Sequence, residues 1–429
     1  MNKATGVLLA ALCGLLAGCA GGGTAANVAA HGSAITGRAM GGQLPVAYGS
    51  VQLWAAGSTG YGSAATLLTS MPSNSIATNA YGEFTITDAF SCPATVDTPV
   101  YLTITQGYSI PGQQNLNLAL MAALGPCNGL SSIPFVNVNE LTTVAAVWAL
   151  APFTAGFDHV GTTATNTVGL QNAFATANML ADIASGNAGG ANLPAGTTVP
   201  TDEIAALGDI LATCVNSAGG ADGDGSPCGT LFHDTAVNGI APTDTIGAAL
   251  NMALHPAVNV AALYQLIPSI GAAFPTSYTQ PAAWTLMVNY AVAGLKQPAG
   301  IANDASGNVW IASAGNNSVV MLDPVGERQF IAMGAAGSTP SALAIDANGD
   351  AWVTNSGDAT IMPVSSAGMI GATVSGNGLS GPQGIAIDAA GYIWVANSGG
   401  AVSVFSSSGD AAGNYTDGSA PAGIAINPQ

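Results

Sequence analysis

In the last third of the chain one pattern of apolar and polar positions occurs three times in full, and a fourth copy begins. Each full copy holds a proline, a short apolar run, the turn Asp-x-x-Gly, and a second apolar run that contains a tryptophan. The aspartate, glycine and tryptophan follow the proline by 6, 9 and 12 residues. The full copies start at Pro298, Pro340 and Pro382, and Pro421 starts a fourth, so the spacings are 42, 42 and 39.

Each copy predicts a β-hairpin followed by a weaker second hairpin. Runs such as Ile-Ala-Ile and Ile-Trp-Val are β-prone. Between them the aspartate can accept from the backbone ahead of it, and the glycine accepts positive φ. A period of this length in all-β units predicts propeller blades of four strands. We expect the recurring tryptophans to fill the space between neighbouring sheets rather than to stack on a ligand; they are Trp310, Trp352 and Trp394.

Residues 298–429 resemble the NHL repeat and, more loosely, the propellers of streptogramin (virginiamycin B) lyases. Those lyases use a histidine general base on the propeller face, and this stretch contains no histidine. The resemblance therefore implies the fold and not the activity. Closed propellers have four to eight blades, so three blades and one strand predict an arc that is truncated, open or completed by another chain. Open blade edges also allow self-association.

The N-terminus predicts export and lipid anchoring. A short positive start precedes the apolar run from Val7 to Ala17, which is too short to span a bilayer. The Leu-Ala-Gly-Cys that ends at Cys19 resembles a bacterial lipobox, which implies a signal peptide over 1–19 and acylation of Cys19. The alternative is an ordinary signal peptide with an incidental cysteine. Ala20, where an inner-membrane lipoprotein carries aspartate, favours the outer membrane, and residues 20–32 are expected to form a flexible tether.

Residues 33–107 alternate apolar and polar positions between turn residues, which predicts strands. The opening Ile-x-Gly at Ile35, the Pro-Val at Pro45 and the Asn-x-x-Gly-x-Phe hairpin that starts at Asn79 resemble a carboxypeptidase-regulatory, or prealbumin-like, β-sandwich. In that family the module is a non-catalytic spacer or adhesive unit, and the resemblance implies nothing more.

Residues 108–292 are predicted to form an α-helical domain of five or six helices. From Leu116 onward alanine and leucine dominate, and the apolar spacing becomes helical. Asn139, Thr201 and Asn259 stand where helix N-caps are expected. With residues 293–429 as a partial propeller of three blades plus one strand, the predicted fold class is multidomain α+β.

Composition excludes several partners. Only 6% of the residues are charged, the net charge is −18, and beyond the predicted signal peptide the basic side chains are Arg38, Lys296 and Arg328. Nucleic acid and anionic lipid head groups are therefore excluded as ligands. No cofactor is implied.

Four cysteines remain after Cys13 and Cys19 are set aside, and an even number in an exported chain indicates disulfides. Three pairings are possible, and proximity in sequence favours Cys92–Cys127 and Cys214–Cys228. A metal site is less expected, because no Cys-x-x-Cys spacing occurs.

No catalytic motif is found, and no catalytic or metal-binding residue is assigned. Gly376-x-Gly-x-x-Gly381 matches a dinucleotide fingerprint but leads into a strand, so a blade connection is expected. Asp222-Gly-Asp-Gly-Ser226 lacks the late glutamate of a calcium loop, so a polar loop is expected. The pairs Asp158–His159 and His233–Asp234 could each orient a general base, although sequence neighbours seldom point at each other.

These features predict a non-enzymatic bacterial cell-envelope lipoprotein that binds or scaffolds through its propeller and helical domain. Its expected partners are the membrane, through Cys19, and an unknown protein or glycan, in the periplasm or at the cell surface. The alternative is a small-molecule lyase or hydrolase in which His159 or His233 faces the repeats. A third possibility is a structural component that assembles through the blade edges.

Overall fold

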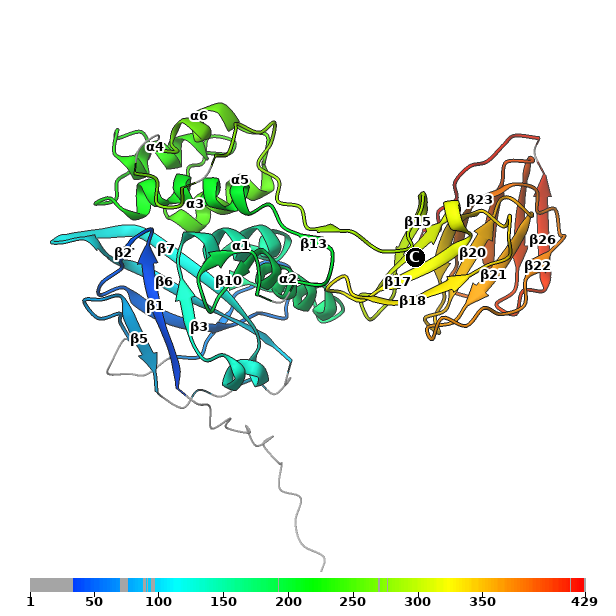
Figure 1. Cartoon of the computed structure of the whole chain (residues 1–429), viewed down its shortest axis with the longest axis horizontal. Coiled ribbons are helices and arrows are strands. Elements are labelled where there is room, and N and C mark those ends of the chain that lie inside the picture. The colour runs from blue at the N-terminus through cyan, green and yellow to red at the C-terminus, as the bar shows by residue number, and fades with distance from the viewer. Residues whose placement is uncertain are drawn as a thin grey trace, which may run out of the picture.

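The computed structural model describes residues 34–427 except 70–75, 88–89, 91, 94–96, 192, 269–270, 276 and 417. The predicted signal peptide, Cys19 and the tether lie outside the described residues. A helix-and-sheet part (residues 34–290) occupies one end of the long axis, and a blade arc (residues 298–427) of three fanned sheets occupies the other (Figure 1). No helix in the described residues is long and apolar enough to cross a membrane.

Two four-stranded sheets face each other across one core in the helix-and-sheet part. The first contains β1 (Ile35–Gly41), β2 (Leu44–Pro45), β5 (Glu83–Ile86) and β8 (Val136–Val138), the last parallel to β1. The second has the order β4 (Thr66–Leu67), β3 (Ser50–Ala55), β6 (Pro99–Ile110) and β7 (Gln113–Pro126). Buried residues of both sheets form a single cluster that includes Ile35, Phe84, Leu53, Leu102 and Leu120.

β7 corrects the predicted start of the helical region. The alanine- and leucine-rich run from Leu116 was expected to be helical, but it pairs with β6 from Gln113 to Pro126. The predicted boundary between residues 107 and 108 therefore falls inside β6. Alternate residues of β7 enter two cores, Leu118 and Leu120 on one face and Ala119 and Met121 on the other. Burial on both faces makes the strand continuously apolar, and this tertiary packing overrides its helix propensity.

Helices cover the outer face of the second sheet. They are α1 (Glu140–Leu150), α2 (Thr167–Leu180), α3 (Thr201–Val215), α4 (Pro227–Asp234), α5 (Thr245–Leu254) and α6 (Val260–Gln265). Short two-stranded ladders join β9 (Thr154–Gly156) to β10 (His159–Val160), β11 (Ala181–Asp182) to β12 (Asn187–Ala188), and β13 (Thr197–Thr198) to β14 (Asn289–Tyr290). In the described ranges there are also three short 3-10 helices, at Cys127–Ser132, Ala151–Phe153 and Ala314–Asn316. Helices and sheet share one core, so they form a single packed unit.

Of the three predicted helix caps, the structure confirms the one at Asn139 and does not confirm those at Thr201 and Asn259. Asn139 caps α1 as predicted: its Oδ1 accepts from the Thr142 backbone N–H at 2.9 Å, and the Thr142 hydroxyl accepts in return. Thr201 is the first residue of α3 and not its cap, because Pro200 occupies that position. Asn259 stands before α6 but has positive φ, and its side chain donates instead to the Asp234 carbonyl at 2.9 Å.

Both favoured disulfides are formed. Cys92–Cys127 ties the segment before β6 to the first 3-10 helix, and Cys214–Cys228 joins the end of α3 to the start of α4. Cys214 and Cys228 are fully buried.

Removing the Cys214–Cys228 disulfide is expected to destabilise the helix layer. The bond closes a loop with a sequence separation of 14. On the chain-entropy model a loop of this length contributes about 3 kcal/mol. We expect the double substitution Cys214→Ala, Cys228→Ala to lower the free energy of unfolding of this layer by about that amount in urea titrations followed by circular dichroism. An unchanged midpoint would contradict the prediction.

The blade arc has three antiparallel sheets in series. The first holds β15 (Pro298–Asn303), β16 (Val309–Ser313), β17 (Ser318–Leu322) and β18 (Arg328–Met333). The second holds β19 (Pro340–Ile345), β20 (Ala351–Asn355), β21 (Thr360–Val364) and β22 (Val374–Ser375). The third holds β23 (Pro382–Ile387), β24 (Ile393–Asn397), β25 (Ala401–Phe405) and β26 (Ala411–Thr416). Each of the three full copies of the repeated sequence therefore forms one propeller-like blade, as predicted. The fourth copy was expected to add one strand, but residues 421–427 form none, because this copy lacks the tryptophan-bearing run with which the first run pairs in each blade.

Two of the three recurring tryptophans lie in the seams between blades, as expected, whereas Trp394 is only partly buried and stacks on Tyr415 of its own blade. Trp310 is fully buried between the first and second blades, and Trp352 is 5% exposed between the second and third. In the first and third blades a hydrogen bond also accounts for the fixed spacing from aspartate to tryptophan. The indole N–H of Trp310 donates to Asp304 Oδ2 at 3.0 Å, and Trp394 donates to Asp388 Oδ2 at 2.9 Å.

The two ends of the arc differ. At the first blade, Val292 and Leu295 from the connecting segment pack on the face formed by Ile311, Val320 and Leu322. At the third blade the fourth copy lies against β23, where a Cβ added to Gly384 would meet Gly423 Cα at 3.0 Å. The segment before the arc thus occupies part of the place that a preceding blade would take.

Candidate ligand-binding site

A cleft of about 730 Å³ opens between the second sheet and α2. One wall is the loop that follows β3, from Ala56 to Thr66. The second wall is formed by Pro93 and by Asp97 to Pro99, where β6 begins. The third is formed by Thr162 to Gln171, which leads into α2. A volume of this size falls in the range of small-molecule sites.

Backbone bridges hold the walls at fixed separation. Gly57 N–H donates to the Val160 carbonyl at 2.8 Å, and Thr162 N–H donates to the Gly57 carbonyl at 3.0 Å. Gly161 has no room for a side chain here, because an added Cβ would lie 2.1 Å from Ser63 Oγ. The Cys92–Cys127 disulfide anchors the second wall, so the cleft is built into the scaffold rather than carried on a free loop.

The lining mixes hydroxyl-bearing and apolar side chains and is almost uncharged. Hydroxyl groups come from Ser58, Thr59, Thr66, Thr162 and Thr167, and Leu170 supplies an apolar patch. Asp97 carries the one charged side chain among the described residues that line the cleft, and Asn128 donates to its Oδ1 at 3.3 Å. Such a lining offers hydrogen bonds to neutral hydroxylated groups, while the net charge of −18 disfavours anions.

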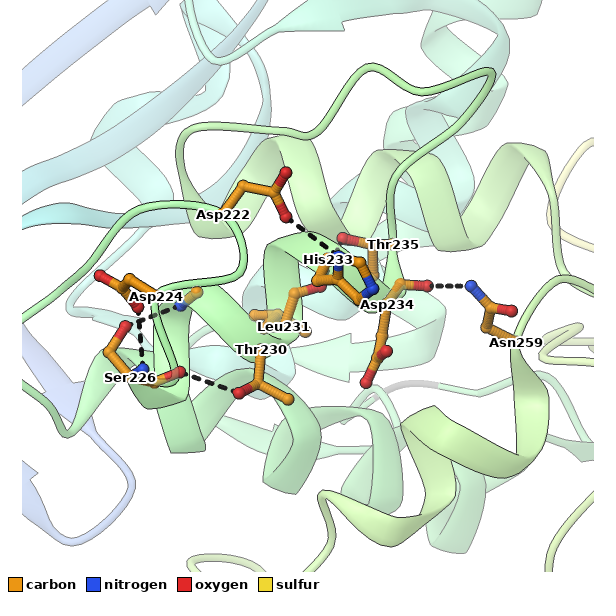
Figure 2. Close-up of polar contacts among 10 residues, drawn as sticks. Asp222, Asp224, Ser226, Thr230, Leu231, His233, Asp234, Thr235 and Asn259 are labelled. Atoms are coloured by element: carbon orange, nitrogen blue, oxygen red, sulfur yellow. Dashed lines mark hydrogen bonds and ion pairs between the residues drawn. The ribbon is translucent and has the colours of Figure 1, made fainter.

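The histidines considered as possible general bases, His159 and His233, do not belong to the lining of this cleft. His159 Nδ1 lies 2.7 Å from Asp158 Oδ1, so this pair of sequence neighbours does form, with both side chains nearly half exposed. His233 faces Asp222 at 3.4 Å and does not pair with Asp234, the partner considered from the sequence (Figure 2). α4, which carries His233, lies at the opposite end of the molecule from the blade arc (Figure 1).

The Asp-Gly-Asp-Gly-Ser loop is a helix-capping structure. Asp224 accepts from the Ala221 and Ser226 backbone N–H groups at 2.7 and 2.8 Å, and Ser226 caps α4 by accepting from Gly229 N–H (Figure 2). A hydrogen bond from the Ser226 side chain, followed by those from the Ala221 and Ser226 backbone N–H groups, holds the pKa of Asp224 below its usual value. The carboxylate is therefore already engaged, and no group of three His, Cys, Asp or Glu side chains suited to a metal occurs in the described residues.

A pair of buried carboxyl groups, Glu140 and Asp209, lies at the N-terminal end of α1. Both oxygens of Glu140 accept from Gly42 N–H, at 3.0 and 2.9 Å, and the side chain is fully buried. Burial raises the pKa of Glu140 to about 8, the Gly42 bond opposes the rise, and the charge of Asp209 adds to it. Asp209 is also fully buried; its Oδ1 accepts from Phe274 N–H, and burial raises its pKa as well.

Sequence reasoning missed the cleft and the buried pair. The cleft combines residues near 57 with residues near 165, and no motif links them. For Glu140, nothing local in the sequence showed that the hairpin at Gly42 would cover the side chain. The assigned cysteines Cys92, Cys127, Cys214 and Cys228 lie where pairing requires, but outside any reactive site.

No family model and no curated protein matches the chain. Among solved structures it is similar to virginiamycin B lyase from Staphylococcus aureus, with 24% identity and a TM-score of 0.28 over 30% of this chain and 44% of that one. A streptogramin B lyase matches with 26% identity and a TM-score of 0.29, over 32% and 46%. Hydrazine synthase of Kuenenia stuttgartiensis matches with 20% identity and a TM-score of 0.28, over 34% and 42%.

These similarities are partial. The chain spans less than half the length of each of these proteins. Two of these three neighbours are lyases of the streptogramin B kind, and TM-scores at this level carry no argument about activity. The propeller-like arrangement of the arc is instead seen directly in the serial blade sheets and their tryptophan seams.

Proposed function

We propose that this protein is a non-enzymatic binding protein of the bacterial cell envelope that takes a neutral, hydroxylated small ligand, such as a glycan unit, in the cleft beside α2. The observation that carries the proposal is the composition of that cleft: serine and threonine hydroxyls stand among apolar side chains, with a single carboxylate in its described lining. Hydrogen-bonding groups fixed on a rigid wall give orientation and specificity without chemistry.

Lipid attachment at Cys19 would hold this cleft at the outer membrane. The lipobox-like sequence, Ala20 after the cysteine and the uncharged tether support this part of the proposal. An acylated anchor needs no attraction to anionic head groups, which suits a chain with so few basic residues.

We further propose that the paired sheets form a prealbumin-like sandwich, extended to about residue 138, and that the arc is an NHL-type partial propeller. Both would present loops for a protein or glycan partner, with helices α1 to α6, which follow β8, supplying the helical domain. The division of the chain into domains rests on the repeat period and on the change from strands to helices after β8.

A small-molecule lyase or hydrolase is the second candidate. The Asp158–His159 pair favours it, because a carboxylate at 2.7 Å can orient an imidazole as general base. The blades that resemble the lyases carry no histidine, so the base would have to act from the helix-and-sheet part. Binding without turnover supports the first candidate, and release of product from a bound ligand supports the second.

Filling the cleft tests the proposed site. Ala164 lies on its rim and is exposed, so Ala164→Trp should occlude the opening without disturbing the core. On an array of neutral oligosaccharides we expect the wild-type protein to retain at least one glycan and Ala164→Trp to bind it tenfold or more weakly. Ala347→Trp, at an exposed turn of the second blade, is the matched control. Failure to retain any glycan, or equal binding by Ala164→Trp, would refute the proposal.

A further inference from the structure

A second, smaller pocket of about 330 Å³ lies where the helix-and-sheet part meets the first blade. The ladder of β13 and β14 forms two of its walls, with Thr197 opposite Tyr290. The turn between β17 and β18 forms the third. Gly326 in that turn lies so close to the Tyr290 ring that an added Cβ would overlap it, at 2.0 Å. The three segments are therefore packed against one another around the pocket.

Arg328 lies in the lining of this pocket and is exposed. One nitrogen of its guanidinium, Nη1, donates to the Ala293 carbonyl, which fixes the side chain across the connecting segment. Although the chain has 22 acidic residues, Arg328 forms no ion pair with any carboxylate in the described residues. A guanidinium has five N–H donors in a planar fork that matches a carboxylate, so most of its donor capacity is open to a ligand.

Glu327 lines the same pocket and is also exposed. Its backbone N–H is held by Asp323 Oδ1 at 2.8 Å, so the main chain that carries both charged side chains is fixed by the turn. Tyr290 adds an aromatic wall, and burial followed by the charge of Asp323 raises the pKa of its phenol, which keeps the hydroxyl protonated. The pocket thus offers one cationic group, one anionic group and an aromatic surface.

We propose that this pocket binds a small zwitterion, an amino acid or a dipeptide, whose carboxylate pairs with Arg328 and whose ammonium pairs with Glu327. The volume of the pocket fits a molecule of that size. A ligand with only one of the two charges would leave either Arg328 or Glu327 without an oppositely charged partner in the pocket. The site is separate from the cleft beside α2, and neither site depends on the other.

Three probes of nearly equal size test the charges one at a time by isothermal titration calorimetry. They are dialanine, its N-acetyl derivative without the ammonium, and dialanine amide without the carboxylate. We expect the wild-type protein to bind dialanine, to bind the N-acetyl derivative tenfold or more weakly, and not to bind the amide measurably. Arg328→Gln should lose dialanine binding, and Glu327→Gln should remove the preference for dialanine over the N-acetyl derivative.

The matched control is Arg38→Gln. Arg38 also donates one bond to a backbone carbonyl, that of Tyr81 at 3.0 Å, and it lies on β1 in the distant sheet. The control should bind dialanine as the wild type does, and so should Ala164→Trp, which separates this site from the cleft. Circular dichroism confirms that each variant is folded. No binding of dialanine, equal binding by Arg328→Gln, or no preference between dialanine and its N-acetyl derivative in the wild-type protein would each overturn the proposal.

Discussion

Replacing Trp310 by alanine is expected to destabilise the blade arc by about 3–5 kcal/mol, the range for removing a large aromatic side chain from a core. Trp310 is fully buried and packs edge-on against Phe330, with ring centroids 5.3 Å apart. It also joins β16 to the second blade through a shared cluster that includes Leu343 and Val353. The substitution leaves a cavity in that seam and removes the N–H donor from Asp304. Hydrogen exchange of the β16 and β20 amides measures the loss.

Trp394→Ala is the matched control for this prediction. Trp394 makes the same bond to the repeat's aspartate, but among the residues that the structure describes no fourth sheet covers it, and it is only partly buried beneath the stacked ring of Tyr415. The smaller buried area predicts a loss of only about 1–2 kcal/mol. Equal losses for the two variants would show that the hydrogen bond, rather than the seam, sets the stability of a blade.

The blades could be predicted because every signal in them is local. The proline, the turn residues and the tryptophan act within 13 residues of one another, and the pattern is repeated. Asp304 accepts from the Ser306 and Asn308 backbone N–H groups, and Gly307 has a φ of +82°, as the turn chemistry required. The role of the aspartate in holding the indole N–H was not foreseen, although its constant spacing was the available signal.

The middle of the chain was harder to predict because its structure depends on distant partners. β7 is helix-prone in composition and becomes a strand only because β6 pairs with it and both of its faces are covered. Asn259 has the residue type of a cap, yet its side chain is drawn to the Asp234 carbonyl, 25 residues away. Asn139 behaved as predicted because its partner, Thr142, is in the same helical turn.

The candidate sites illustrate the same limit. Arg328 and Glu327 were visible as rare charges, but the pocket they line needs Tyr290 and Thr197 from the other part of the chain. Tertiary contacts decide which polar residues converge, so composition could exclude partners such as nucleic acid but could not identify a cleft.

The stability of the helix-and-sheet part is expected to fall as the pH rises from about 4.5 to about 8, and Glu140 is a main cause. Burial raises the pKa of Glu140 from 4.5 to about 8 in the folded protein. The folded state therefore keeps a proton that the unfolded state releases at lower pH. The stabilisation is fully present below pH 4.5 and is lost as the pH passes through 8. At about 1.4 kcal/mol for each unit, the loss amounts to roughly 4–5 kcal/mol.

Glu140→Gln should remove this part of the pH dependence. The glutamine cannot ionise, and its carbonyl can still accept from Gly42 N–H. The variant should therefore gain stability over the wild-type protein as the pH rises from 5 to 8.5, in urea titrations at fixed ionic strength. Asp209, the acidic group that faces Glu140, is present in both proteins, so only the part of its titration that depends on the Glu140 charge enters the comparison. Glu83→Gln, at an exposed position, should leave the pH dependence unchanged. If the curves for Glu140→Gln and the wild type ran parallel, Glu140 would not be the group that couples folding to pH.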